Sequence, residues 1–170
     1  ATVIATGLSA TKLAEVRARV TDHVLNTRHA EDPAGVRSFR DEVKALTGGQ
    51  GVDVVYDAVG GATALESLRA MAFGGRFLIV GWTSTPDVAR GKGQRGAPNA
   101  NQFPTNVVQM KSLTVMGCPA VIAVAKNPAL RTERLQKILQ WVREGRIRPH
   151  VSHRFPLADV REAMRLRWNG

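Results

Sequence analysis

The sequence predicts an α/β fold built on a doubly wound parallel sheet. Short apolar runs alternate along the chain with segments whose apolar residues recur at helical spacing. Runs such as Phe77-Leu78-Ile79-Val80 are apolar at every position, so both faces of these strands are predicted to be buried. Strands of this kind, separated by amphipathic helices, are typical of a parallel sheet that is covered by helices on both sides.

The individual elements follow from the same periodicity. The first helix is predicted over residues 12–19, and the second over residues 36–46, where a Thr-Gly-Gly stop follows it. Two further helices, residues 62–71 and 130–144, carry leucines on one face. The predicted strands are residues 2–6, 23–26, 52–57, 76–80 and 113–116.

The loops that follow the strands form a candidate ligand site, because doubly wound sheets bind ligands at the carboxyl ends of their strands. Asp57, Gly60 and Gly61 follow one buried strand. Glycine leaves room for a ligand and permits a positive φ at the turn into the next helix. The alternative is a tight turn in which Asp57 caps that helix, and the spacing leaves both interpretations open. The other loops on the same rim are residues 6–9, 27–28 and 81–84.

The loop after the first strand favours NADP over NAD. A dinucleotide site holds the ribose 2′-hydroxyl of NAD with an acidic residue, and accepts the 2′-phosphate of NADP with small polar and basic residues. No acid is present here, whereas Ser9 offers a hydroxyl, Lys12 a positive charge, and Arg28 a second cation from the next loop. The alternatives are that Ser9 caps the helix and that Lys12 is a solvated side chain of its first turn.

Five stretches of the chain resemble one enzyme family, in the order in which that family has them. They are VIATGLSATKL, FRDEVKALTGGQGVDVVYDAVGG, ESLRAMAFGGRFLIVG, NVVQMKSLTVMGC and GRIRPHVSHRFPLADVREAMR. Together they resemble the cofactor half of the alcohol dehydrogenase-like, medium-chain dehydrogenase/reductases, and within it the zinc-independent NADPH:quinone oxidoreductases. The resemblance implies an oxidoreductase that transfers hydride from NADPH to a quinone or an α,β-unsaturated carbonyl.

The resemblance also implies which residues hold the cofactor, and it places no catalytic side chain and no metal ligand in this chain. Ser9 and Lys12 correspond to the 2′-phosphate side of the site. The remaining cofactor-binding positions are Asp57, Val59, Gly60 and Gly61 beside the cofactor, Gly81 and Trp82 near the nicotinamide, and Asn106 before the last strand.

On the same resemblance the sheet is incomplete. The family has a catalytic domain, and then the first strand and helix of the Rossmann fold with a glycine-rich loop, ahead of the residues that match here. We therefore expect a partial dinucleotide-binding domain over residues 1–147 and a C-terminal segment, residues 148–170, that would return to the catalytic domain. Without that domain nothing excludes water or orients a hydride acceptor, so we expect little or no turnover from these residues alone.

The absent strand is predicted to leave two open edges. In the usual strand order, residues 2–6 and 52–57 would face the gap, and unpaired buried backbone groups are costly. We expect direct pairing of these strands, an element exchanged in a dimer, or disorder. The strand at residues 113–116 resembles the one through which family members join two sheets, which predicts a homodimer.

Composition limits the remaining hypotheses. The chain has 170 residues, 44% of them hydrophobic, enough for one core, and a net charge of +10. That charge raises an alternative function, a basic module that binds nucleic acid or another polyanion, but the basic residues are scattered and aromatic residues are only 5% of the chain, which disfavours nucleic acid. No run spans a membrane, and the single cysteine, Cys118, fits the reducing cytoplasm.

Two other features are weak candidates. His150 and His153 have no third ligand nearby in the sequence, so a surface pair is favoured over a metal site. The loop from Ser84 to Asn106 carries Arg90, Lys92 and Arg95 among glycines and prolines, and either covers the nicotinamide or forms a solvated basic segment.

Overall fold

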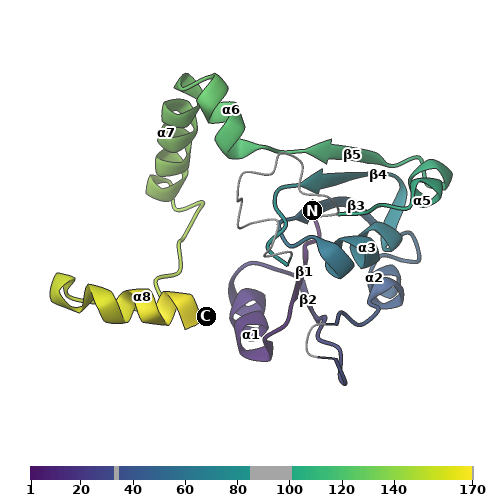
Figure 1. Ribbon diagram of the computed structural model, residues 1–170, viewed down its shortest axis with the longest axis horizontal. Helices are drawn as coiled ribbons and strands as arrows, with labels where there is room; N and C mark the ends of the chain where they lie inside the picture. The colour runs from purple at the N-terminus through teal and green to yellow at the C-terminus, as the bar shows by residue number, and fades with distance from the viewer. Residues whose placement is uncertain (33–34, 85–100, 170) are drawn as a thin grey trace. The chain divides into compact units, whose positions relative to one another are not determined.

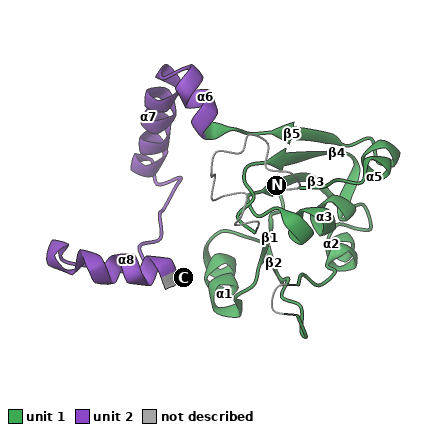
Figure 2. Cartoon of the chain, viewed as in Figure 1, with its two compact units in different colours: residues 1–120 green, residues 121–170 purple. Residues whose placement is uncertain are grey.

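The computed structural model describes residues 1–32, 35–84 and 101–169. The chain divides into two compact units, residues 1–120 and 121–170 (Figure 2). The functional boundary that the sequence predicts, between residues 147 and 148, falls inside the second unit and stays a prediction.

The first unit contains two parallel sheets (Figure 1). One sheet pairs β1 (Ile4–Gly7) with β2 (His23–Asn26), and the other has the order β3-β4-β5, with β3 (Val52–Asp57), β4 (Met71–Ile79) and β5 (Thr114–Gly117). This confirms the predicted α/β class with parallel strands. It also confirms an incomplete doubly wound arrangement, since the two sheets correspond to its two halves without a strand between them.

Four helices accompany these strands: α1 (Ala10–Arg19), α2 (Arg40–Leu46), α3 (Gly61–Arg69) and α5 (Thr105–Met110). The predicted start of α2 at residue 36 is wrong, because Val36 forms an antiparallel bridge with Arg28. Phe39 is the N-cap of α2, and it is buried together with Val43. The apolar residues before the helix therefore serve the core from an extended segment.

Two hydrophobic clusters form the core of this unit. The first lies between β3, β4, α3 and α5 and contains the fully buried Leu68 and Phe77, with Phe103 edge-on against Phe77 at 5.0 Å between ring centroids. The second joins β2, α2 and the end of α3 through Leu25, Phe39, Val43 and Ala70, with Ile4 and Val52 packed against it. The second cluster holds the two sheets together in the absence of hydrogen bonds between them.

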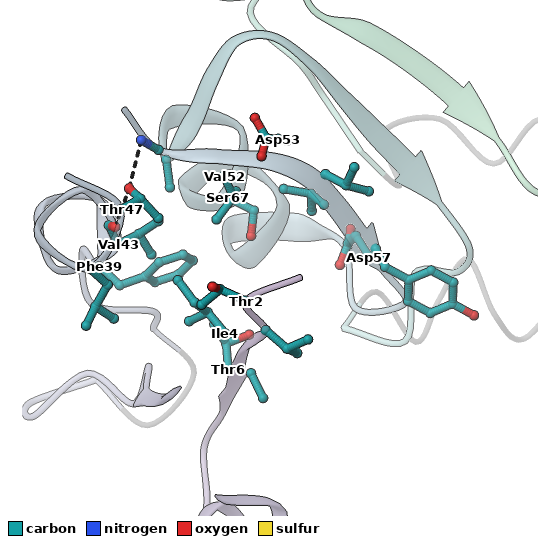
Figure 3. A pocket seen from close by; sticks show the side chains of 18 of the residues that line it. Thr2, Ile4, Thr6, Phe39, Val43, Thr47, Val52, Asp53, Asp57 and Ser67 are labelled. Carbon is teal, nitrogen blue, oxygen red and sulfur yellow. Dashed lines mark hydrogen bonds between the residues drawn. The ribbon is translucent and has the colours of Figure 1, made fainter. Parts of the chain in front are cut away.

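The edges of β1 and β3 line a cavity of about 910 Å³. Figure 3 shows side chains of both strands around this space, with Phe39 and Val43 of α2 on one side. The expectation that β1 and β3 pair directly is wrong, because they belong to separate sheets. Side chains of α2 and α3 also line the cavity between β1 and β3. The facing edges of the two strands therefore border this cavity and not each other.

The second unit is helical. It contains most of α6 (Ala120–Lys126), then α7 (Ala129–Arg143), the short 3₁₀ helix η1 (Leu157–Asp159) and α8 (Val160–Asn169). The predicted helix at residues 130–144 is confirmed as α7, whose apolar residues remain partly exposed. Among the described helices, none combines the length and the apolar character needed to cross a bilayer.

Candidate functional site

The turn after β3 is organised by the carboxylate of Asp57. Its Oδ1 accepts hydrogen bonds from the backbone N–H of Val59 at 2.9 Å and of Gly60 at 3.2 Å, and its Oδ2 accepts from Gly60 at 3.1 Å. Asp57 is 4% exposed, so both oxygens are occupied within the turn. The structure therefore shows Asp57 closing the tight turn into α3, through the N–H groups of Val59 and of the N-cap residue Gly60.

The two glycines of the turn are required by its geometry. Gly60 has φ +78° and Gly61 has φ +59°, so both adopt the positive φ that the sequence predicts. A Cβ on Gly60 would lie 2.8 Å from Asn101 Oδ1, and a Cβ on Gly61 would lie 2.8 Å from Ser84 Oγ. The backbone at the start of α3 can therefore be approached closely only because these two residues have no side chain.

The loop after β4 is hydrogen-bonded to this turn along its length. The N–H of Gly81 donates to the Asp57 carbonyl at 3.2 Å, and Thr83 and Ser84 donate to the carbonyls of Ala58 and Val59. Trp82, which is 42% exposed, lies against Gly60, since a Cβ on that glycine would be 3.2 Å from the Trp82 Cα. The Asp57 turn and the Trp82 loop thus form one rim with fixed backbone geometry.

Asn101 completes this rim and was not found by sequence reasoning. Its Oδ1 accepts a hydrogen bond from the N–H of Gly61 at 2.8 Å, which caps the first turn of α3 from a segment 40 residues away. Its Nδ2 is buried and has no hydrogen-bond partner among the residues that the structure describes. No local pattern could have identified this residue, because the contact exists only after β4 and the segment before α5 are placed beside the turn.

The second group of candidates surrounds the loop after β1. Ser9 is the N-cap of α1, and its Oγ accepts from the N–H of Lys12 at 3.3 Å. Arg28 folds back over this loop and donates from Nε to the carbonyl of Leu8 at 3.1 Å. The structure thus brings the guanidinium of Arg28 to the loop that holds Ser9, and Lys12 is exposed on the first turn of α1. The first turn of α1 contains no acidic residue.

Asp57 and Val59 of the first group line the cavity between the strands, together with Thr6 of β1, whereas Ser9, Lys12 and Arg28 are not among its lining residues. The structure does not bring Asn106 to either group. It lies on α5, which leads into the amino end of β5, whereas the other candidates lie at the carboxyl ends of their strands (Figure 1). The basic residues of the predicted loop, Arg90, Lys92 and Arg95, lie outside the described residues.

A family model described as a zinc-binding dehydrogenase matches residues 18–169. The chain belongs to this family. Quinone oxidoreductase-like protein 2 of Bos taurus is 33% identical over 126 residues, which are 74% of this chain and 32% of that protein. The chain thus spans about a third of the length of this protein and of its similar counterparts in Mus musculus and Rattus norvegicus.

Solved structures agree with the assignment to the zinc-binding dehydrogenases. An NAD-dependent alcohol dehydrogenase aligns with a TM-score of 0.65 and 28% identity, covering 97% of this chain and 40% of that one. A mycobacterial protein complexed with NADPH aligns with a TM-score of 0.68 and 25% identity, covering 95% of this chain and 45% of that one. Both alignments support the medium-chain dehydrogenase/reductase resemblance of the sequence.

The description of the family raises the question of zinc. Structural and catalytic zinc sites use three or four Cys, His, Asp or Glu ligands. Within residues 1–32, 35–84 and 101–169, no three such side chains gather in a way that would hold a metal ion. The described part of the chain therefore does not fit a zinc site, and we assign it no role that depends on the metal.

Proposed function

We propose that this chain is the cofactor-binding part of an NADPH-dependent oxidoreductase that transfers hydride to a quinone or an α,β-unsaturated carbonyl. The observation that carries the proposal is the rim at the carboxyl ends of β3 and β4. There the backbone of Gly60 and Gly61 is held by Asp57 and Asn101, beside the exposed Trp82. The absence of side chains on the two glycines lets Asn101, Trp82 and Ser84 pack against the turn, and a cofactor would contact the rim that these residues form together.

The preference for NADPH rests on the charges around the loop after β1. Arg28 is anchored on the Leu8 carbonyl, Ser9 presents a hydroxyl at the start of α1, and Lys12 adds a positive charge to the first turn. An anion at this point would also interact favourably with the helix N-terminus. The 2′-phosphate of NADPH gains from all of these groups, whereas NADH places only a neutral 2′-hydroxyl there.

The cofactor, when bound, would supply the hydride. The residues of this chain would hold the adenosine side through Ser9, Lys12 and Arg28, and the nicotinamide side through the backbone of Gly81 and the ring of Trp82. We assign no proton-transfer role to any of the described side chains, and the low turnover of these residues alone stays a prediction. We place the protein in the cytoplasm, because its single cysteine, Cys118, has no second cysteine for an internal disulfide.

We also propose that two copies associate through the outer edge of β5. This strand pairs with β4 on one side only within the described residues, and its four residues are exposed. An uncovered edge strand is a template for a second strand. Sedimentation analysis tests this proposal, and a chain that stays monomeric over a wide concentration range would exclude it.

The proposed function is tested by titration with NADPH and NADH, followed by nicotinamide fluorescence and calorimetry at two salt concentrations. Changing Lys12 and Arg28 to Gln should weaken NADPH binding by about tenfold or more, as expected for two lost charged contacts, and leave NADH binding unchanged. Lys126→Gln on α6 is the matched control, because it removes one exposed charge far along the chain. Equal affinity for the two cofactors would contradict the assigned specificity. Binding of an oligonucleotide but of neither cofactor would favour the basic module instead.

A further inference from the structure

A buried hydrogen-bond donor on the rim, the Nδ2 of Asn101, has no partner among the described residues. A buried polar group without a hydrogen bond is costly, so such groups are rare in folded proteins and call for an explanation. The other such side-chain atom in the described part of the chain, Trp141 Nε1, belongs to the second unit. Asn101 instead lies beside the turn after β3, where a bound ligand can supply the missing acceptor.

The orientation of the Asn101 amide is set by its own acceptor. Oδ1 accepts a hydrogen bond from the N–H of Gly61 at 2.8 Å. Turning the amide over would place the Nδ2 donor against that N–H donor, which excludes the opposite orientation. The segment is held in place by Phe103, two residues further on, whose ring packs against Phe77 in the core. Nδ2 therefore points away from the N–H of Gly61 toward another group.

The acceptors of the rim are already engaged by the rim itself. Both carboxylate oxygens of Asp57 accept from backbone N–H groups of the turn. The Ala58 carbonyl accepts from the N–H and the hydroxyl of Thr83, and the Val59 carbonyl accepts from the same two groups of Ser84. A carbonyl oxygen has two lone pairs, so these two carbonyls are fully used. The partner of Nδ2 must therefore come from another source.

We propose that Asn101 is a cofactor-binding residue, whose Nδ2 donates a hydrogen bond to an oxygen of the nicotinamide half of NADPH. NADPH occupies this rim in the proposed function, on which the inference rests, with its nicotinamide half beside Trp82. A Cβ on Gly60 would lie 2.8 Å from Asn101 Oδ1 and 3.2 Å from the Trp82 Cβ, so Asn101 and Trp82 meet at one glycine. The carboxamide, the ribose and the phosphate of that half all carry oxygen acceptors.

The burial of Nδ2 implies a small rearrangement when the cofactor binds. Trp82 is 42% exposed and lies against the same glycine as Asn101, and we expect its ring to move toward the cofactor. The Oδ1 of Asn101 would keep its hydrogen bond to the N–H of Gly61 throughout. One amide would then join the cofactor to the first turn of α3.

The experiment measures cofactor affinity in the 170-residue chain by calorimetry. Asn101→Asp keeps an acceptor for the N–H of Gly61 and replaces the Nδ2 donor with an oxygen. It should weaken the binding of both NADPH and NADH by about tenfold or more, because an acceptor then faces an acceptor. Gln102→Glu is the matched control, since it makes the same change at the neighbouring exposed residue. Its affinities should stay within about twofold of the parent chain, because salt screens an exposed charge.

A second ligand, adenosine 2′,5′-bisphosphate, tests whether the rest of the site survives the substitution. It carries the 2′-phosphate and no nicotinamide, so Asn101→Asp should bind it within about threefold of the parent chain. Changing Lys12 and Arg28 to Gln should produce the opposite pattern, with weaker binding of the bisphosphate and unchanged binding of NADH. A merely structural role of Asn101 would weaken the bisphosphate and NADPH in the same proportion.

A further variant covers the case in which Asn101→Asp does not fold. Its new carboxylate lies on the turn that already holds the carboxylate of Asp57, and like charges repel. Asn101→Ala removes the donor without adding a charge, and it should show the same selective loss of NADPH and NADH. Urea unfolding without ligand shows whether each variant is folded.

Two results would overturn the inference. They are affinity for NADPH within about twofold of the parent chain in the folded Asn101 variants, and a parallel loss of NADPH and the bisphosphate. A parent chain that binds neither dinucleotide would overturn the proposed function and this inference with it. A parent chain that binds NADPH while the Asn101 variants bind it equally well would overturn the inference alone.

Discussion

Removing the carboxylate of Asp57 should destabilise the first unit by about 3 kcal/mol. In Asp57→Ala the buried N–H of Gly60 loses its only acceptor, at about 1.5–3 kcal/mol for a hydrogen bond to a charged group. The N–H of Val59 also loses its acceptor. Because Val59 is itself 40% exposed, water replaces part of that hydrogen bond, and the loss is about 1 kcal/mol. Asp57→Asn keeps one acceptor oxygen and should lose only about 1 kcal/mol.

The assay is urea unfolding, followed by circular dichroism and by hydrogen exchange at the amide of Phe77, which reports on the core beneath the turn. Asp53→Ala is the matched control, because this residue has the same chemistry on the same strand but is exposed, and its loss should change stability by less than about 0.5 kcal/mol. A change below about 0.5 kcal/mol for Asp57→Ala, or equal effects of the two substitutions, would refute the capping role.

Two further predictions concern the backbone and pH. Gly61→Ala should cost about 2 kcal/mol in thermal or urea unfolding, because it adds a clash 2.8 Å from a serine oxygen to the strain of φ +59°. Gly48→Ala, at φ +60° with no neighbour within 4 Å, should cost only about 1 kcal/mol. Equal losses would show that the clash is relieved. The Arg37 guanidinium lowers the pKa of Glu42 through a side-chain hydrogen bond, so this half-exposed pair stabilises the fold above the unfolded pKa of Glu42 and is lost as pH falls through the lower folded value. Glu42→Gln should therefore remove about 0.5 kcal/mol at neutral pH and nothing in acid, and a pH-independent difference would contradict the assignment.

Helices and strands were predicted well where the spacing of apolar residues fits only one of the two. The predicted strands at residues 23–26 and 52–57 are β2 and β3 without change, and α7 differs from its predicted bounds by one residue at each end. The start of α2 was wrong because Val36 and Phe39 fit a helical repeat but are used in other ways, one in a bridge with Arg28 and the other as the N-cap. Periodicity detects that these residues are buried, and it does not distinguish how the backbone buries them.

The candidate site likewise has features that the sequence predicts and features that only the structure reveals. The loops at the strand ends and the positive φ of Gly60 and Gly61 could be argued from the sequence, because parallel strands and glycine turns are recognised from nearby residues. The family came from the resemblance of five stretches of the chain. The role of Asp57 could not be decided, since a capping carboxylate and a ligand-binding carboxylate have the same spacing. The hydrogen bonds to Val59 and Gly60 show that Asp57 holds the turn, and its contact with a cofactor stays a prediction.

By itself the sequence determined the α/β class, the order of the strands and the rim on which a cofactor site would lie. These follow from side-chain periodicity and turn chemistry, which act over a few residues. Only the tertiary structure decided that Asn101 caps α3, that Arg28 reaches the Leu8 carbonyl, and that β1 and β3 stay unpaired on either side of a cavity. Each of these depends on segments that are distant in the chain, and on backbone groups, which are chemically alike at every residue and differ only in where the fold places them.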